Sequence, residues 1–277
     1  MSAFESFIHS LQWEMTTPLP YGVWHLVSLL CVVALAAVLV IFFRDADDKT
    51  MRRILLVGWI VIAFLEVYKQ VIFALDVNEG VASWDYAWYA FPFQFCSSPL
   101  YAIPFVFLLK DCPLRRCVVT FLSTFSLLAG IAVMLYPDTV FMSYVGINVQ
   151  TMVHHGLQVV FGIYLFVYNR RRMHHMQWKN IFGGVLVFVG FLIVAMALNL
   201  IVHNVHLAKG MDDTFNMFFI SPYFDCELPI LSTVRDTAPY PVFLAVYIVG
   251  FSLGASLIYA IELAISRLCT RKAEKNI

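Results

Sequence analysis

Charged side chains are scarce in this chain. Asp, Glu, Lys and Arg make up 13% of its 277 residues, whereas a soluble globular protein has about 25%. Hydrophobic residues reach 61%, against about 45–50% in soluble domains. This composition excludes a soluble enzyme and a disordered chain, because so much apolar surface needs lipid as its solvent. We therefore expect a polytopic membrane protein.

The sequence also lacks an excess of basic charge, a disulfide framework and a basic N-terminal segment. The net charge is zero, with 18 basic and 18 acidic residues, which argues against a nucleic-acid partner. Six cysteines in a chain of this length do not form a disulfide framework. Residues 1–21 contain no Lys or Arg, so they lack the basic segment that begins a signal peptide.

Seven stretches of mostly apolar residues are long enough to cross a bilayer, which takes roughly 20 residues of helix. They cover residues 23–43, 54–75, 92–109, 117–136, 145–168, 181–203 and 242–266. We find no soluble domain and no long linker between them. Residues 1–277 are therefore expected to form a single all-α domain, a bundle of seven transmembrane helices.

Basic residues predict how this bundle is oriented. They cluster after the first, third, fifth and seventh spans, whereas the other side carries only Lys209 and Arg235. The clusters are Arg44, Lys49, Arg52 and Arg53; Lys110, Arg115 and Arg116; Arg170, Arg171, Arg172 and Lys179; and Arg267, Arg271, Lys272 and Lys275. By the positive-inside rule, the N-terminus lies outside and the C-terminus lies in the cytoplasm.

The longest predicted loop is non-cytoplasmic and covers residues 204–241. It is rich in apolar side chains, including Phe215, Met217, Phe218, Phe219, Ile220, Tyr223 and Phe224. Irregular backbone at membrane depth is tolerated only against protein or a water-filled cavity. We expect this loop to fold over the bundle mouth or to dip between helices, as a lid.

Strongly polar side chains inside a span are costly and mark functional sites. Four predicted spans carry such residues at one depth, in the outer half of the membrane. They are Glu66, Lys69 and Gln70; Gln94, Cys96, Ser97 and Ser98; Thr151, His154, His155 and Gln158; and Asn199, His203 and His206. We infer one polar cavity that opens to the outer leaflet beneath the aromatic loop.

Cys96 is the candidate nucleophile of this cavity. It follows Pro92 by about one helical turn, and proline is favoured at the first position of a helix. The helix dipole stabilises a reactive thiolate in that turn. Pro99 is expected to kink the helix beside the thiol by freeing the carbonyl of Phe95.

His154 is the candidate general base. It lies with Gln150 and Gln158 on a polar stripe at i, i+4 spacing. His155 is rotated about 100° from that stripe, and we assign it a supporting role or a contact to head-group oxygens. Glu66 either pairs with Lys69 three residues later or orients a histidine.

The same residues also have structural interpretations. Cysteine in a membrane helix is most often a small packing residue, and Cys96 could instead pair with Cys226. The histidines could form interhelical hydrogen bonds. Glu66 and Lys69 could be a buried structural pair.

A metal site is a further alternative. His203 and His206 have the spacing of helical zinc ligands, but zinc needs three or four. We predict no metal and no cofactor.

Several motifs carry a resemblance to a known family. The segment Phe91-Pro-Phe-Gln-Phe-Cys-Ser-Ser-Pro-Leu-Tyr101 resembles the third-span signature of the YwaF-like integral membrane proteins, which include the eukaryotic transmembrane protein 164 acyltransferases. The motifs His154-His155-Gly156, Asn216-Met-Phe-Phe219 and Pro239-Tyr-Pro241 also fit, as does the seven-span layout. The resemblance implies a bacterial plasma-membrane protein in which Cys96 and His154 transfer acyl groups between phospholipids. Gln94 departs from the histidine expected two residues before the cysteine in many bacterial relatives.

The leading hypothesis is an intramembrane acyltransferase or acyl-ester hydrolase, with membrane phospholipids and lysophospholipids as partners. His154 would deprotonate Cys96, and the acyl chain would pass through a thioester to a lysophospholipid or to water. Gln94, Ser97 or Ser98 would stabilise the oxyanion, and Lys69 or His203 would contact the phosphate. Gln158 and Asn199 are further supporting residues. The alternative is a proton-coupled transporter or a ligand-binding protein that uses the same cavity.

Overall fold

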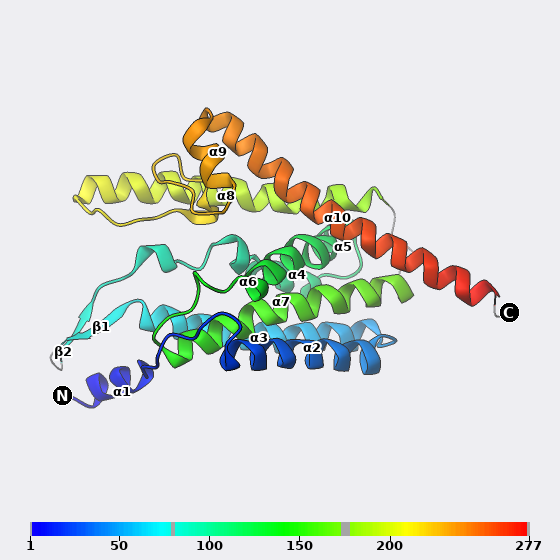
Figure 1. The fold of residues 1–277 in the computed structure, drawn as a ribbon, viewed down its shortest axis with the longest axis horizontal. Helices are drawn as coiled ribbons and strands as arrows, with labels where there is room; N and C mark the ends of the chain where they lie inside the picture. Colours follow the sequence, from blue (N-terminus) through cyan, green and yellow to red (C-terminus); the bar gives the residue numbers. More distant parts are fainter. Residues whose placement is uncertain (1, 79–80, 173–177, 276–277) are drawn as a thin grey trace.

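The computed structural model describes residues 2–78, 81–172 and 178–275 (Figure 1). Within these ranges, six helices are long and apolar enough to cross a membrane. They are α2 (Val23–Phe43), α3 (Asp48–Ile72), the continuous run of α5 (Pro113–Phe121), the π-helical turn η3 (Leu122–Ser126) and α6 (Leu127–Leu135), then α7 (Val145–Arg172), α8 (Asn180–Lys209) and α10 (Tyr240–Lys275). The prediction of a helical multi-pass membrane protein is confirmed.

The third predicted span differs from the other six. Only Phe95–Leu108 is helical there, as the 3₁₀ turn η2 (Phe95–Ser97) followed by α4 (Ser98–Leu108). This segment is shorter than the roughly 20 residues that a bilayer requires. Residues 85–94, which come directly before it, are irregular apart from the single turn η1 (Trp88–Ala90).

Both proline predictions for this segment are wrong. Pro92 lies in irregular backbone and does not begin the helix. Pro99 stands in the first turn of α4, where the missing N–H costs nothing, so it starts the helix and does not kink it. The carbonyl of Phe95 is not free, because it accepts the N–H of Ser98.

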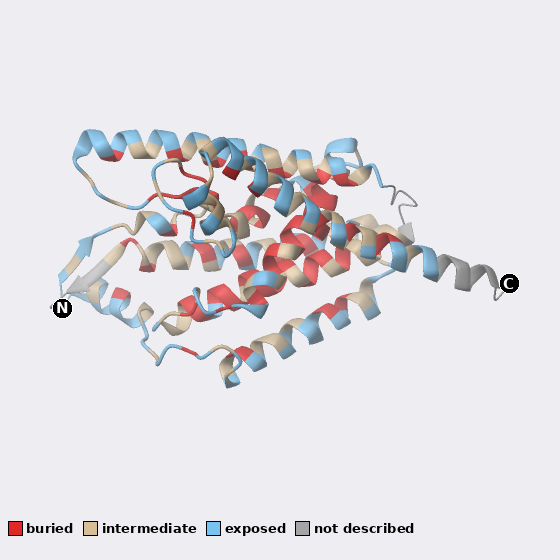
Figure 2. Ribbon diagram, turned by 45° about the horizontal axis from the view of Figure 1, so that its top comes forward, coloured by how far each residue is buried: buried red, intermediate tan, exposed pale blue. Residues whose placement is uncertain are grey.

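Two helical runs form the centre of the bundle, namely α5–η3–α6 and α7. In each, 72% of the spanning residues are buried, against 11–22% in the other four. Helices α2 and α3 lie on one side of this centre and α8 and α10 on the other (Figure 1). Figure 2 shows the buried residues gathered in the middle, with exposed residues on the outer helices. The outer helices expose apolar side chains because lipid takes the place of water there.

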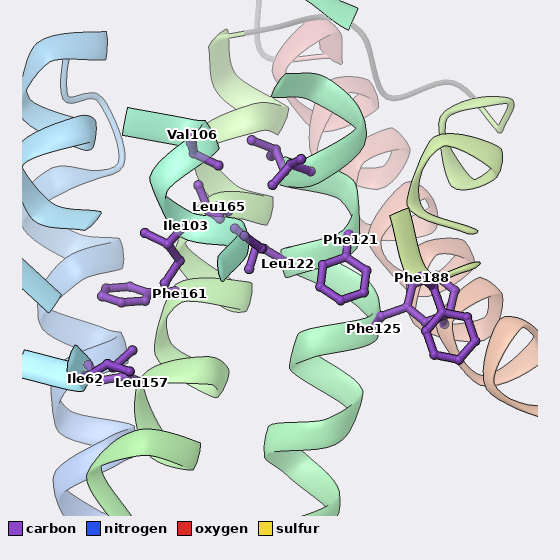
Figure 3. Packing of buried hydrophobic residues seen from close by; sticks show 14 of the residues in the cluster. Ile62, Ile103, Val106, Phe121, Leu122, Phe125, Leu157, Phe161, Leu165 and Phe188 are labelled. Atoms are coloured by element: carbon purple, nitrogen blue, oxygen red, sulfur yellow. The ribbon is translucent and has the colours of Figure 1, made fainter. Parts of the chain in front are cut away.

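Aromatic rings fill the space between the central and outer helices (Figure 3). Phe125 of η3 stacks on Phe188 of α8, with their ring centroids 4.8 Å apart. Phe161 of α7 packs against Gly58 of α3, where a Cβ atom would overlap the ring. The glycine therefore allows α3 and α7 to approach closely.

One end of the bundle carries the N-terminal helix α1 (Ala3–Leu11) and an antiparallel hairpin of β1 (Leu75–Asn78) and β2 (Val81–Trp84). We call it the hairpin end. The C-terminus lies at the opposite end (Figure 1).

The long loop starts at Gly210 rather than at residue 204, because α8 continues to Lys209. Gly210 ends the helix with a positive φ of 67°, which glycine adopts without strain. The loop contains the 3₁₀ turn η4 (Met217–Phe219) and the short helix α9 (Leu231–Thr237). Phe215, Met217 and Phe218 are at most 1% exposed, so the loop enters the bundle as expected.

Candidate functional site

A polar cavity of about 180 Å³ lies between α3, α7 and η2, and loops of the hairpin end form part of its wall. We call it the polar cavity. Six of the ten predicted site residues line it: Glu66, Lys69, Cys96, Ser97, His154 and His155. Gln150 and Thr151 of α7 line it as well. Residues far apart in the chain thus line one cavity.

His154 is anchored to the main chain of Cys96. Its Nε2 atom lies 2.9 Å from the Cys96 carbonyl oxygen. A carbonyl only accepts, so Nε2 carries the hydrogen and the neutral ring has its lone pair on Nδ1. His154 is 3% exposed, and its Nδ1 has no hydrogen-bond partner. The structure therefore leaves the basic nitrogen of this imidazole unoccupied.

Gln158 binds the same carbonyl. Its Nε2 donates to the Cys96 oxygen from one turn further along α7. Two side chains of one helix thus hold the backbone of Cys96, which fixes where its side chain begins. Gln158 itself does not line the polar cavity.

His155 has a similar arrangement. Its Nδ1 lies 2.7 Å from the carbonyl of Thr151, so Nδ1 donates and Nε2 holds the lone pair. That Nε2 is also buried without a partner. The centroids of the two imidazole rings are 5.4 Å apart. The cavity wall therefore includes two histidines that each keep one unpaired nitrogen.

The thiol of Cys96 is free, as is that of Cys226, so the alternative disulfide between them is not formed. The contacts of His154 and Gln158 are to the backbone of Cys96 and not to its sulfur. Cys96 lines the polar cavity together with both histidines.

Glu66 and Lys69 form an ion pair in the cavity wall. Lys69 Nζ lies 2.7 Å from the carboxylate of Glu66. The side chain of Lys69 is 16% exposed and that of Glu66 is 5% exposed. Gln70 and Gln150 also donate to Glu66, at 2.8 and 3.3 Å. A buried carboxylate is tolerated when its oxygens are satisfied in this way.

Tyr86 supports this pair from the loop after the hairpin. Its hydroxyl donates to Gln70 Oε1 at 2.6 Å, while Gln70 Nε2 also donates to the carbonyl of Ala90. Burial, and then the negative charge of Glu66, raises the pKa of Tyr86 to about 12. The phenol therefore remains a donor at physiological pH.

Gln94 and Asn199 lie outside the polar cavity. Both hold the aromatic loop, which is the long loop that starts at Gly210. Gln94 accepts the N–H of Phe218 at 2.8 Å and donates to the carbonyl of Asn216 at 2.9 Å. Asn199 accepts the N–H of Met217 at 2.7 Å and donates to its carbonyl at 3.0 Å. We call these four bonds the amide clamp.

The clamp holds a strained turn in place. Phe218 and Phe219 have φ angles of 59° and 56°, a left-handed conformation that costs about 1–3 kcal/mol per residue outside glycine. The clamp and the packing of the Phe218 ring on Phe93 and Phe95 offset that cost. Sequence reasoning missed this role, although the Asn216–Phe219 motif signalled that the turn is special.

The histidines of α8 also lie apart from the polar cavity. His203 stacks on Tyr223, with centroids 3.6 Å apart and an interplanar angle of 11°. His206 is buried beside Trp88, and neither of its ring nitrogens has a partner. In the part of the chain that the structure describes, no group of three His, Cys, Asp or Glu side chains could hold a metal ion.

Sequence reasoning also overlooked Glu262 of α10. It is 4% exposed, and both carboxylate oxygens lack a hydrogen-bond partner. The rule that ionisable residues inside a span mark functional positions would have found it.

Comparison with known proteins places these motifs in one family. A family model described as "TMEM164 family" matches residues 20–259, which include all ten predicted site residues but not Glu262. No curated protein and no solved structure matches the chain.

Proposed function

Because the chain belongs to the TMEM164 family, we propose that it is an intramembrane acyltransferase that acts on glycerophospholipids, with Cys96 as nucleophile and His154 as general base. One observation carries the proposal: a free thiol and an unpaired imidazole nitrogen belong to residues of the same cavity wall, within the membrane-spanning bundle. Nucleophilic cysteines are activated by an adjacent base of this kind.

The first half of the reaction forms a thioester. Nδ1 of His154 takes the thiol proton of Cys96, and the sulfur attacks the carbonyl carbon of a phospholipid ester. The tetrahedral intermediate collapses as the ester C–O bond breaks. The leaving glyceryl oxygen takes the proton from His154 and departs as a lysophospholipid hydroxyl.

The second half transfers the acyl group. The hydroxyl of another lysophospholipid gives its proton to His154 and attacks the thioester carbon. The C–S bond breaks, and the thiolate of Cys96 recovers the proton. Water in place of the lysophospholipid makes the protein a hydrolase.

Other residues have supporting roles in this proposal. Ser97 lines the polar cavity, and the buried hydroxyl of Ser98 has no partner, so these side chains are the candidate donors to the oxyanion. Lys69 is the candidate contact to the head-group phosphate, whereas the unpaired Nε2 of His155 can only accept a hydrogen bond, for example from a lipid hydroxyl. Glu66 keeps the ammonium of Lys69 in position.

One observation favours a second candidate, a proton-coupled transporter. Glu262 is a buried carboxyl without a partner in a spanning helix, and such groups also line proton pathways. Under this alternative, a pH gradient drives solute uptake into vesicles that contain the protein, and Glu262→Gln abolishes that uptake.

The deciding experiment is a transacylation assay in vesicles. The purified protein is supplied with a phosphatidylcholine that carries a labelled acyl chain and with an unlabelled lysophospholipid. Label should reach the lysophospholipid with the parent protein. It should also do so with the control variant Cys31→Ala, which removes a free thiol outside the polar cavity. Transfer should be lost in Cys96→Ala and in His154→Ala. Transfer that persists in Cys96→Ala contradicts the proposal.

A further inference from the structure

A second and larger hollow lies beside the polar cavity. It has a volume of about 740 Å³ and runs along α3 and α4 to the hairpin end. We call it the α3–α4 groove. Trp59, Ala63 and Val67 of α3 form one wall, and Leu100 and Pro104 of α4 form the other. The groove exists because α4 is short and irregular backbone precedes it, so this side of α3 is covered by a short helix rather than by a full-length one.

The polar side-chain atoms of Trp59, Gln70 and Tyr101 in the groove wall are already paired. Trp59 Nε1 donates to the carbonyl of Leu100 at 2.7 Å, and the Tyr101 hydroxyl donates to the carbonyl of Pro92 at 2.7 Å. The side-chain amide of Gln70 is bonded to Glu66, Ala90 and Tyr86. A polar ligand would find few free hydrogen-bond partners here, so the groove suits hydrocarbon.

The groove opens toward lipid. Val67 is 63% exposed and Trp84 of β2 is 74% exposed, and both line it. Trp84 stands at the hairpin end, where tryptophan is favoured at the boundary between head groups and acyl chains. A chain from the surrounding leaflet can therefore enter the groove sideways, without crossing a polar barrier.

The groove and the polar cavity meet at one residue. Glu66 lines both, and Pro92 of the groove precedes Cys96 of the cavity by four positions. A lipid whose ester lies at Cys96 can thus extend its hydrocarbon past Glu66 into the groove. We infer that the α3–α4 groove binds one acyl chain of a membrane glycerophospholipid. This inference deepens the function proposed above, and it rests on that function for the position of the ester.

Photocrosslinking tests the inference without catalysis. Full-length Cys96→Ala protein is placed in phosphatidylcholine vesicles that contain a phosphatidylcholine with a diazirine on one acyl chain. After irradiation, mass spectrometry locates the labelled peptides. Label should concentrate on residues 59–71 and 100–104 of the groove walls. Ala63→Trp, which fills the groove, should remove most of that label.

Val57→Trp is the matched control. Val57 lies on the same helix, is 62% exposed and does not line the groove. This variant should keep the groove label. Label that is spread evenly over all lipid-facing helices, or that is unchanged by Ala63→Trp, overturns the inference. Lipid adducts that are absent from both groove walls also overturn it, because the acyl chain would then not occupy the groove.

The two proposals can fail separately. If transacylation survives Cys96→Ala while the groove label still responds to Ala63→Trp, the chemistry is wrong and the binding site stands. If transacylation needs Cys96 but the groove label does not respond, the binding site is wrong and the chemistry stands.

Discussion

The imidazole of His154 holds the backbone of Cys96 through a hydrogen bond of 2.9 Å from Nε2 to the carbonyl oxygen. The proposed base therefore positions the residue that it is proposed to activate. The bond also selects the tautomer, because Nε2 must carry the hydrogen and Nδ1 keeps the lone pair. Anchoring and proton transfer thus use different nitrogens of one ring, and a substitution can separate them.

His154→Gln should separate these two roles. A glutamine Nε2 can donate to the Cys96 carbonyl, but the amide cannot accept a proton at neutral pH. Thermal unfolding should stay close to that of the parent protein. Acyl transfer should fall by about 10²–10⁴-fold, the usual contribution of a general base. His155→Gln is the control, since it removes the neighbouring imidazole, and it should reduce transfer less. Parent-like transfer in His154→Gln would exclude His154 as the base.

Glu66→Gln should destabilise the fold. The change leaves the ammonium of Lys69 in a largely buried position without its counter-charge. Removing one partner of a buried pair costs about 3–5 kcal/mol. Thermal unfolding in detergent measures the loss.

The double variant Glu66→Gln with Lys69→Met is the control for charge. It removes both charges and should recover most of the stability of the parent protein. Equal destabilisation in the single and double variants would show that the carboxylate acts through its bonds to Gln70 and Gln150 rather than through Lys69.

Six of the seven predicted spans could be read from the sequence, and so could the grouping of Cys96 with His154, for a simple physical reason. A helix rises 1.5 Å per residue, so the position of a polar residue in a span predicts its depth in the bundle. This reasoning brought Cys96 and His154 to one level, and both line the polar cavity. The apolar run and the helix have the same bounds, Val23–Phe43. Gly22 precedes the run and Arg44 follows it, so both ends are marked in the sequence.

Contacts between distant segments could not be read in this way. Gln94 and Phe218 are 124 residues apart in the chain, and only the folded loop brings the amide to that backbone. Depth alone also does not say which neighbour a side chain faces. Asn199 was expected in the polar cavity because of its depth alone. Its side chain instead binds the backbone N–H and carbonyl of Met217. The start of the third predicted span was misplaced at Pro92. Proline is compatible both with a first helical turn and with the irregular backbone found there.

Cys226 should react slowly with maleimide in the folded protein. It lies in the loop before α9, and burial raises the pKa of its thiol. A raised pKa means less thiolate at a given pH, so alkylation at pH 8 should be slower than in denatured protein and should accelerate as the pH rises. Mass spectrometry of the alkylated peptide gives both rates. Equal rates in the folded and denatured protein would show that the loop does not cover this thiol.

Gln94→Ala should release the aromatic loop. The variant leaves the buried N–H of Phe218 without a partner, which costs about 1–3 kcal/mol, and it removes one of the two donors to the carbonyl of Asn216. The strained φ angles of Phe218 and Phe219 then lose part of the contacts that maintain them. Hydrogen exchange of the amides in residues 215–221 should become faster, while exchange in α7 stays unchanged.

Gln94→Glu serves as the matched variant. A carboxylate still accepts the N–H of Phe218 but cannot donate to the carbonyl of Asn216, so exchange should lie between that of the parent protein and that of Gln94→Ala. If the loop exchanged at the parent rate in both variants, Asn199 and the packing of Phe218 on Phe95 would be sufficient to hold it, and Gln94 would have no structural role in the turn.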